Sequence, residues 1–152
     1  MDPAQDPLVD ILIVDDEEDL RSVLKETLEL EGYSVTTAED AVQAEEILEK
    51  GTVPLILCDI SMPLKSGLEL VTSLRKKGHV SAFVMISAHS DSERLVQAIQ
   101  LGAIDYIIKP FNIEDILKKV PIWLEVGKRT KALGKDHGVR MIELLRLKKP
   151  VG

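Results

Sequence analysis

Five side chains able to take part in acid–base or phosphoryl chemistry follow short apolar runs of this 152-residue chain. Asp15 and Asp16 follow the first run, and Asp59 follows the third. Ser87 follows the fourth run, and Lys109 follows the fifth. Each has an ordinary explanation alone, since Asp is a favoured helix cap and lysine is commonly a solvated surface residue. The combination of acids, hydroxyl and ammonium at the ends of these runs is what indicates a site.

This combination suits the transfer of a phosphoryl group. Three carboxylates held close together repel one another and raise each other's pKa. A divalent cation relieves the repulsion, and hard oxygen ligands beside open water positions suit Mg²⁺. A carboxylate beside such an ion can attack phosphorus as a nucleophile. The ammonium and the hydroxyl would then stabilise charge on the transferring phosphoryl oxygens.

The apolar runs have the composition of β-strands and alternate with amphipathic helical stretches, which favours an α/β fold with a parallel sheet. The most apolar runs indicate strands covered on both faces, and the more polar second run indicates an edge strand. In a doubly wound sheet, functional groups gather beyond the carboxyl ends of the strands. The predicted strands are Ile11–Val14, Ser34–Thr37, Leu55–Cys58, Phe83–Ile86 and Asp105–Ile108.

The fifth predicted helix begins near Asn112 and contains Pro121. Proline lacks an N–H and clashes with the preceding turn, so the helix is predicted to kink or restart there. We expect residues 1–126 to form one domain and residues 127–152 to form a C-terminal helical extension. So short a segment cannot bury a core of its own, and the extension is therefore not an independent domain.

The charge is distributed unevenly along the chain. The net charge is −7, yet residues 127–152 hold eight basic and two acidic residues. The acidic remainder makes nucleic-acid binding an improbable function, because that affinity comes from neutralising phosphates. The basic segment leaves three interpretations open: a solvated extension, a helix for dimerisation or docking, and a contact with nucleic acid.

The composition also excludes several classes of protein. No apolar run is long enough to span a bilayer, and the N-terminus lacks the basic and apolar parts of a signal peptide. The single cysteine, Cys58, excludes an internal disulfide and a cysteine-based zinc site. These observations predict a cytoplasmic location without membrane contact.

Four motifs, in the order of the predicted strands, resemble the receiver domain of two-component response regulators. The resemblance covers about residues 8–126 and implies a flavodoxin-like (βα)5 fold, a doubly wound five-stranded parallel sheet. An acidic pair alone would be weak evidence, but four motifs that each end a predicted strand are specific. The motifs are Ile13–Glu17, Asp59–Pro63 with Gly67 after it, Ile86–Ala88, and Gly102–Ala103 with Tyr106–Phe111.

The resemblance implies a role for each acid of the cluster. Asp59 matches the phosphoacceptor, which takes its phosphoryl group from a histidine kinase or a phosphotransfer protein. Asp16 matches a direct ligand of Mg²⁺, and Asp15 matches a ligand through water. Asp59 itself and the backbone carbonyl of Ser61 complete the protein's share of the metal site.

The resemblance also implies a conformational switch. Ser87 matches a hydroxyl that moves toward the phosphoryl group, and Lys109 matches its cationic partner. Tyr106 matches an aromatic residue that turns inward when Ser87 moves, and the Lys109–Pro110 bond is expected to be cis. The output is then a contact with a downstream protein, with a homodimer as another option. Such a chain is no metabolic enzyme and catalyses only its own phosphorylation and dephosphorylation.

One residue departs from the family pattern, and two other functions compete with the phosphoacceptor. Lys65 stands where the family usually has an apolar residue, which could alter the loop or a partner surface. A receiver-like scaffold that is never phosphorylated would keep the fold without the chemistry. A Mg²⁺-dependent phosphatase normally needs a second carboxylate two residues after its aspartyl nucleophile, where this chain has Ser61. Glu17 and Glu18 are interpreted as solvated acids.

Overall fold

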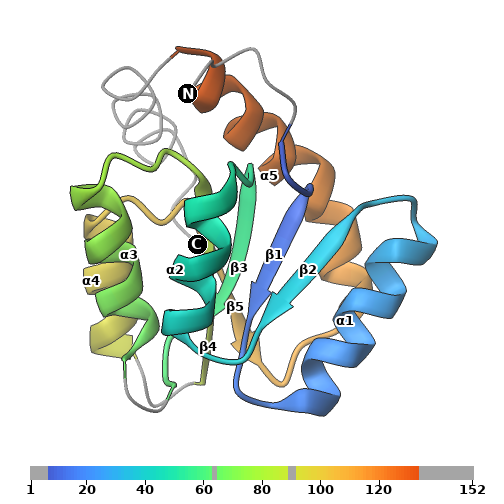
Figure 1. Ribbon diagram of the computed structural model, residues 1–152. Coiled ribbons are helices and arrows are strands. Elements are labelled where there is room, and N and C mark those ends of the chain that lie inside the picture. The colour runs from blue at the N-terminus through green and yellow to red at the C-terminus, as the bar shows by residue number, and fades with distance from the viewer. Residues whose placement is uncertain (1–6, 63–64, 89–91, 134–152) are drawn as a thin grey trace.

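The computed structural model of the chain describes residues 7–62, 65–88 and 92–133 (Figure 1). Its strands form one parallel sheet in the order β2-β1-β3-β4-β5, which is the flavodoxin-like order and confirms the predicted fold. The strands are β1 (Ile11–Val14), β2 (Val35–Ala38), β3 (Leu55–Asp59), β4 (Ala82–Ala88) and β5 (Asp105–Lys109). The helices are α1 (Glu18–Leu30), α2 (Ala41–Lys50), α3 (Gly67–Lys76), α4 (Ser92–Gln100) and α5 (Ile113–Leu133).

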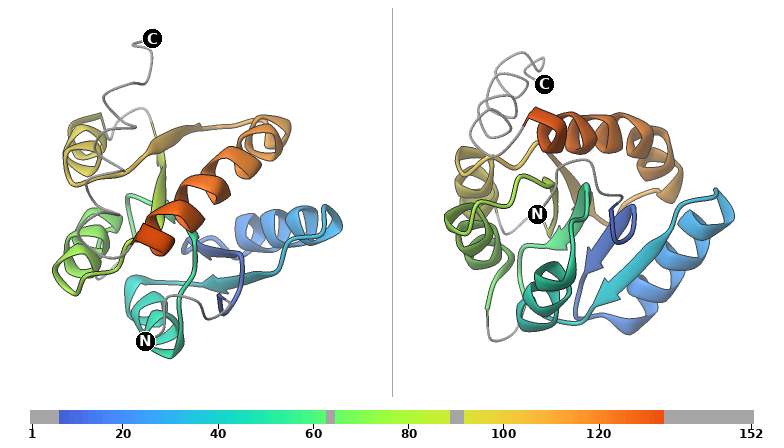
Figure 2. Two further views of the ribbon diagram at one scale, coloured as in Figure 1. Left: turned by 90° about the horizontal axis from the view of Figure 1, so that it is seen from above. Right: turned by 45° about the horizontal axis from the view of Figure 1, so that its top comes forward.

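The side chains of β1 explain why helices cover both faces of the sheet. All four are buried, and successive side chains of a strand point to opposite faces. Leu12 and Val14 pack in one apolar cluster with α2, α3 and α4, whereas Ile11 and Ile13 pack in another with α1 and α5. Figure 1 shows α2 in front of the sheet and α5 behind it, and Figure 2 gives two further views. The more polar strand β2 lies at an edge, as its sequence predicted.

The helix α5 runs through Pro121 without a break, so the predicted restart at this proline is wrong. Pro121 lies on the exposed side of the helix, while the buried side continues across it with Val120, Trp123 and Leu124. Burial of this apolar side offsets the hydrogen bond that proline cannot make. Although α5 is long, no helix among the described residues combines the length and apolar composition needed to cross a bilayer.

The last turns of α5 belong to the segment that was predicted to be an extension. The hydroxyl of the fully buried Thr130 donates to the carbonyl oxygen of Val80 at 2.8 Å. Gly127 lies so close to Pro54 that an added Cβ would stand 2.0 Å from the Pro54 carbonyl oxygen. These two contacts join α5 to the chain just before β3 and β4. The predicted boundary after residue 126 thus falls within α5, and residues 134–152 lie outside the described part of the chain.

The same end of the sheet contains a largely buried cation. One terminal nitrogen of Arg75 donates to the carbonyl oxygens of His79 at 2.9 Å and Ser81 at 3.1 Å. The other donates to the carbonyl oxygen of Gly102 at 3.5 Å, and the guanidinium lies 5.0 Å from the ring centroid of Phe83. Burial lowers the pKa of Arg75 to about 10, so the group stays charged at neutral pH. Arg75 therefore joins the end of α3 to the segments that precede β4 and β5.

Candidate functional site

The register of the sheet brings the predicted site residues to one edge. Asp15 and Asp59 directly follow a pair of residues that are matched between β1 and β3. Ser87 and Lys109 lie at the carboxyl ends of β4 and β5, which pair with each other. Because all the strands are parallel, these four side chains gather at the carboxyl edge of the sheet, as the sequence predicted.

A close helix approach supports the end of β3. The N–H of Gly67, the first residue of α3, donates to the carbonyl oxygen of Ile60 at 3.0 Å. A Cβ on Gly67 would lie 2.4 Å from the carbonyl oxygen of Asp59. A residue with a side chain cannot approach this closely, so glycine is needed here. The start of α3 thereby holds the backbone of Asp59.

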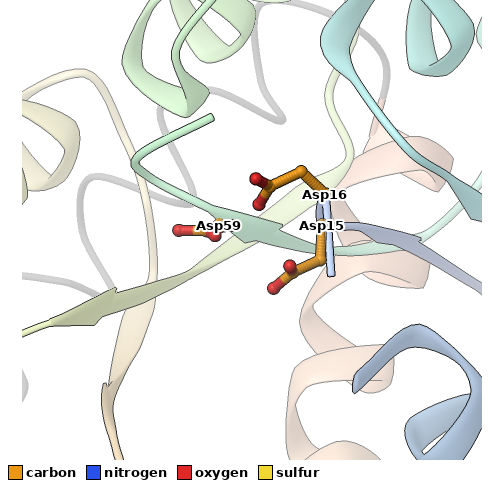
Figure 3. Close-up of side chains that lie close together, drawn as sticks. All are labelled: Asp15, Asp16 and Asp59. Carbon is orange, nitrogen blue, oxygen red and sulfur yellow. The ribbon is translucent and has the colours of Figure 1, made fainter. Parts of the chain in front are cut away.

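Asp15, Asp16 and Asp59 form an acidic cluster (Figure 3). Each contributes one carboxylate oxygen, and these oxygens lie within 4.8 Å of one another. Asp15 and Asp59 are buried, whereas Asp16 is exposed. The N–H of Ser61 donates to Asp59 at 3.0 Å, which brings the Ser61 backbone beside the cluster. Close carboxylates with one solvent-facing member fit a small divalent cation that keeps part of its water shell.

Lys109 supplies the positive charge of the site. Its ammonium lies 3.4 Å from Asp15 Oδ2 and 3.3 Å from Asp59 Oδ2. It also lies 3.2 Å from Oε1 of Glu17. Burial alone would lower the pKa of Lys109, but the three carboxylates outweigh burial and raise it. The ammonium is therefore charged at neutral pH. The Lys109–Pro110 bond is cis, as predicted.

Burial disfavours the ionised form of Asp15 and Asp59, the two buried carboxylates of the cluster. It raises the pKa of Asp59 from 3.8 to about 6, although the N–H of Ser61 opposes this rise. The negative charge of Asp15 adds to the rise, and Lys109 opposes it. Burial likewise raises the pKa of Asp15 above its ordinary value. At neutral pH the site thus holds more negative charge than its one ammonium neutralises, which is what a cation would relieve.

Neither of the two predicted switch residues is hydrogen-bonded to the acidic cluster. Ser87 is fully buried, and its hydroxyl donates to the carbonyl oxygen of Ala88 at 2.9 Å. Tyr106 is 40% exposed on β5, and its backbone N–H donates to the Asp105 side chain at 2.8 Å. In this structure neither side chain has a hydrogen bond to an acid of the cluster.

Two ion pairs at and near the site were missed by sequence reasoning. Glu17 was interpreted as a solvated acid, but its side chain is bonded to Lys109. Lys65 was recognised as unusual, yet its partner Glu45 on α2, at 2.6 Å, was not predicted. Glu17 could have been suspected from its place directly after the acidic pair. Nothing in one sequence links Lys65 to a residue 20 positions away.

The strand order, the acidic cluster and the lysine that precedes a cis proline together are those of a class of signalling domain. The family model of the response regulator receiver domain matches residues 11–121. The chain therefore belongs to the receiver-domain family of two-component response regulators, as the motifs indicated.

Relatives and solved structures agree with this family. The chain is 38% identical over 110 residues to the transcriptional regulatory protein CpxR of Escherichia coli, covering 72% of this chain and 47% of CpxR. It is 36% identical over 133 residues to the alginate biosynthesis transcriptional regulatory protein AlgB of Pseudomonas putida, covering 88% of this chain and 30% of AlgB. The crystal structure of the receiver domain of NtrX from Brucella abortus matches with a TM-score of 0.72 and 36% identity, covering 76% of this chain and 98% of that domain. The chain spans less than half of CpxR and of AlgB.

Proposed function

We propose that this chain is a phosphoacceptor that receives a phosphoryl group on Asp59 and passes the signal to another protein. The observation that carries the proposal is the environment of the Asp59 carboxylate. It lies at the end of β3, beside two further carboxylates and 3.3 Å from the ammonium of Lys109. A carboxylate with a cation on one side and a candidate metal site on the other suits attack on phosphorus.

In the proposed transfer, an oxygen of Asp59 forms a bond to the phosphorus of a phosphohistidine on a histidine kinase or phosphotransfer protein. The bond between phosphorus and the imidazole nitrogen breaks, and its electron pair stays on that nitrogen. Lys109 stabilises the charge on the phosphoryl oxygens as they approach Asp59. The product is an acyl phosphate on Asp59, which water can later hydrolyse.

Asp15, Asp16, Asp59 and the carbonyl of Ser61 are the groups that would hold Mg²⁺. Bound there, Mg²⁺ supplies positive charge to the cluster and to the phosphoryl oxygens. The chain's own residues do the rest: Asp59 provides the nucleophile and Lys109 orients the phosphoryl group. The burial of Asp15 and Asp59 supports this assignment, because buried carboxylates are stabilised by a bound cation.

The proposed switch begins at Ser87. Phosphorylation adds close to two negative charges and three acceptor oxygens at Asp59. Such an acceptor competes with the Ala88 carbonyl oxygen for the Ser87 hydroxyl. Tyr106, half exposed on the neighbouring strand, then turns toward the space that Ser87 leaves. The signal is a population shift between two packings of this edge, biased by the charge on Asp59.

The decisive experiment measures a covalent adduct. The chain is incubated with Mg²⁺ and acetyl phosphate, and its intact mass is followed in time. We expect a gain of one phosphoryl group in the wild-type chain and in the control variant Asp19→Asn, whose carboxylate is exposed on α1. We expect no gain in Asp59→Asn. Steady hydrolysis of the donor without an adduct would favour the phosphatase, and the absence of both adduct and Mg²⁺ binding would favour the scaffold.

The remaining sequence expectations stay proposals of the same kind. We propose that residues 1–126 carry the receiver chemistry and that residues 127–152 extend it, with α5 continuous between them. The partner downstream is a protein that reads the altered surface, and a homodimer is an alternative form of that contact. The cytoplasmic location predicted from the sequence belongs with this proposal.

A further inference from the structure

Glu17 occupies an unusual position at the start of α1. It is the residue that caps the amino end of the helix, yet its side chain makes no capping hydrogen bond. Its backbone N–H instead donates to Asp15 at 2.8 Å, and its carboxylate reaches across to Lys109 at 3.2 Å. The side chain therefore does not accept a hydrogen bond from the free N–H groups at the start of α1, as a capping side chain usually does. Its carboxylate forms an ion pair with Lys109, which lies 92 positions away in the sequence.

The ammonium of Lys109 forms ion pairs with both buried and exposed carboxylates. Its partners Asp15 and Asp59 are buried, with side chains 0% and 8% exposed, whereas the side chain of Glu17 is 62% exposed. Glu17 and Lys109 also line the same open hollow beside the site, together with Leu20, Pro110 and Phe111. Glu17 therefore holds Lys109 from the solvent side, at the mouth of the site.

We propose that Glu17 is a positioning residue that holds Lys109 toward solvent and thereby limits phosphorylation of Asp59. The inference rests on the function proposed above. A phosphoryl group on Asp59 needs the Lys109 ammonium for its own oxygens, and Glu17 competes for that ammonium. The competition slows formation of the acyl phosphate and weakens binding of anions that mimic it.

Two variants separate the position of the carboxylate from its charge. Glu17→Gln keeps the length of the side chain and removes the charge. Glu17→Asp keeps the charge but is one methylene shorter. Because Asp is a favoured helix cap, the shorter carboxylate is directed to the free N–H groups of α1 and away from Lys109. Glu18→Gln is the matched control, because Glu18 is the next residue and is also exposed.

The test measures the rate of adduct formation from acetyl phosphate at saturating Mg²⁺ and, separately, the affinity for beryllofluoride in the presence of Mg²⁺. We expect Glu17→Gln and Glu17→Asp both to react about two- to fivefold faster and to bind beryllofluoride tighter by the same factor. That factor is what losing one partly exposed ion pair would produce. Glu18→Gln is expected to behave as the wild-type chain, and thermal unfolding of each variant verifies that it folds.

The outcomes distinguish this inference from the function on which it rests. If the wild-type chain forms an adduct and Glu17→Gln matches its rate and affinity, the role of Glu17 is refuted alone. The role of Glu17 is also refuted if Glu17→Gln is faster but Glu17→Asp matches the wild-type chain. In that case the negative charge near the site would explain the slower reaction, without an ion pair between residue 17 and Lys109. If the wild-type chain forms no adduct and binds no beryllofluoride, the proposed function fails and this inference fails with it.

Discussion

Replacing Asp59 by Asn should stabilise the metal-free chain at neutral pH. Burial raises the pKa of Asp59 from 3.8 to about 6, so the folded chain holds an ionised carboxylate that burial disfavours. A shift of about two units corresponds to roughly 3 kcal/mol of unfolding free energy. The opposing effect of Lys109 is already contained in this net shift. We therefore expect Asp59→Asn to raise the free energy of unfolding by about 3 kcal/mol at pH 7.5.

The sign of the pH dependence follows from the direction of the shift. Between pH 3.8 and about 6 the folded chain binds more protons at Asp59 than the unfolded chain does. The contribution of Asp59 to stability is therefore fully present at low pH and is lost as the pH rises through this window. The stability difference between Asp59→Asn and the wild-type chain should vanish near pH 4 and reach its full size above about pH 6.5.

Urea unfolding in EDTA at several pH values, followed by the fluorescence of Trp123, measures this difference. Glu46→Gln, which removes an exposed carboxylate from α2, is the control for a general charge effect. Added Mg²⁺ should cancel most of the difference, because at 100 times its Kd a ligand stabilises the wild-type chain by about 2.7 kcal/mol. A metal-free Asp59→Asn chain that is less stable at pH 7.5, or a difference that is constant from pH 4.5 to 7.5, would refute the reasoning.

Three further variants test other parts of the structure. Gly127→Ala should lower the free energy of unfolding by more than about 2 kcal/mol, because its Cβ would stand 2.0 Å from the carbonyl oxygen of Pro54. Urea unfolding checks this, and a change below about 0.5 kcal/mol would contradict the close contact of α5 with the sheet. Trp123→Phe should cost about 1–2 kcal/mol, because it removes the 3.0 Å hydrogen bond to Asp105 and leaves a partly buried acceptor with one donor fewer. Thermal unfolding followed by circular dichroism measures this loss, since the variant has no tryptophan. Lys65→Met should change stability by less than about 1 kcal/mol in the same assay, because its ion pair with α2 is partly exposed, and a larger loss would mean that the pair holds the loop after β3.

The sheet and its site were predictable because they depend on short local patterns. Runs that are apolar over four residues must be strands when helical stretches separate them. The polar residue that follows each run then lies at a common edge by topology alone. Asp15, Asp59 and Lys109 meet there although 94 positions separate the first from the last.

The burial of single side chains and the partners of their ion pairs were harder to predict, because both depend on where each helix lies on the sheet. Leu30 continues the apolar spacing of α1 but is 84% exposed, since it is the last residue of the helix and extends beyond the core. Val23 shares that spacing and is 52% exposed. Pro121 was expected to make α5 kink or restart, and the burial of Val120 before it and of Trp123 and Leu124 after it explains why α5 continues. The partners of Glu17 and Lys65 lie on other elements, which no local pattern connects.

The bonds of Arg75 give the two ends of the sheet different mechanical properties. One side chain crosslinks three backbone carbonyl groups at the end remote from Asp59, so that end is stiff. The opposite end holds strand termini, unbalanced charge and the Ser87 hydroxyl, whose hydrogen-bond partner can change. A new charge at Asp59 would therefore act at the end of the sheet that Arg75 does not crosslink.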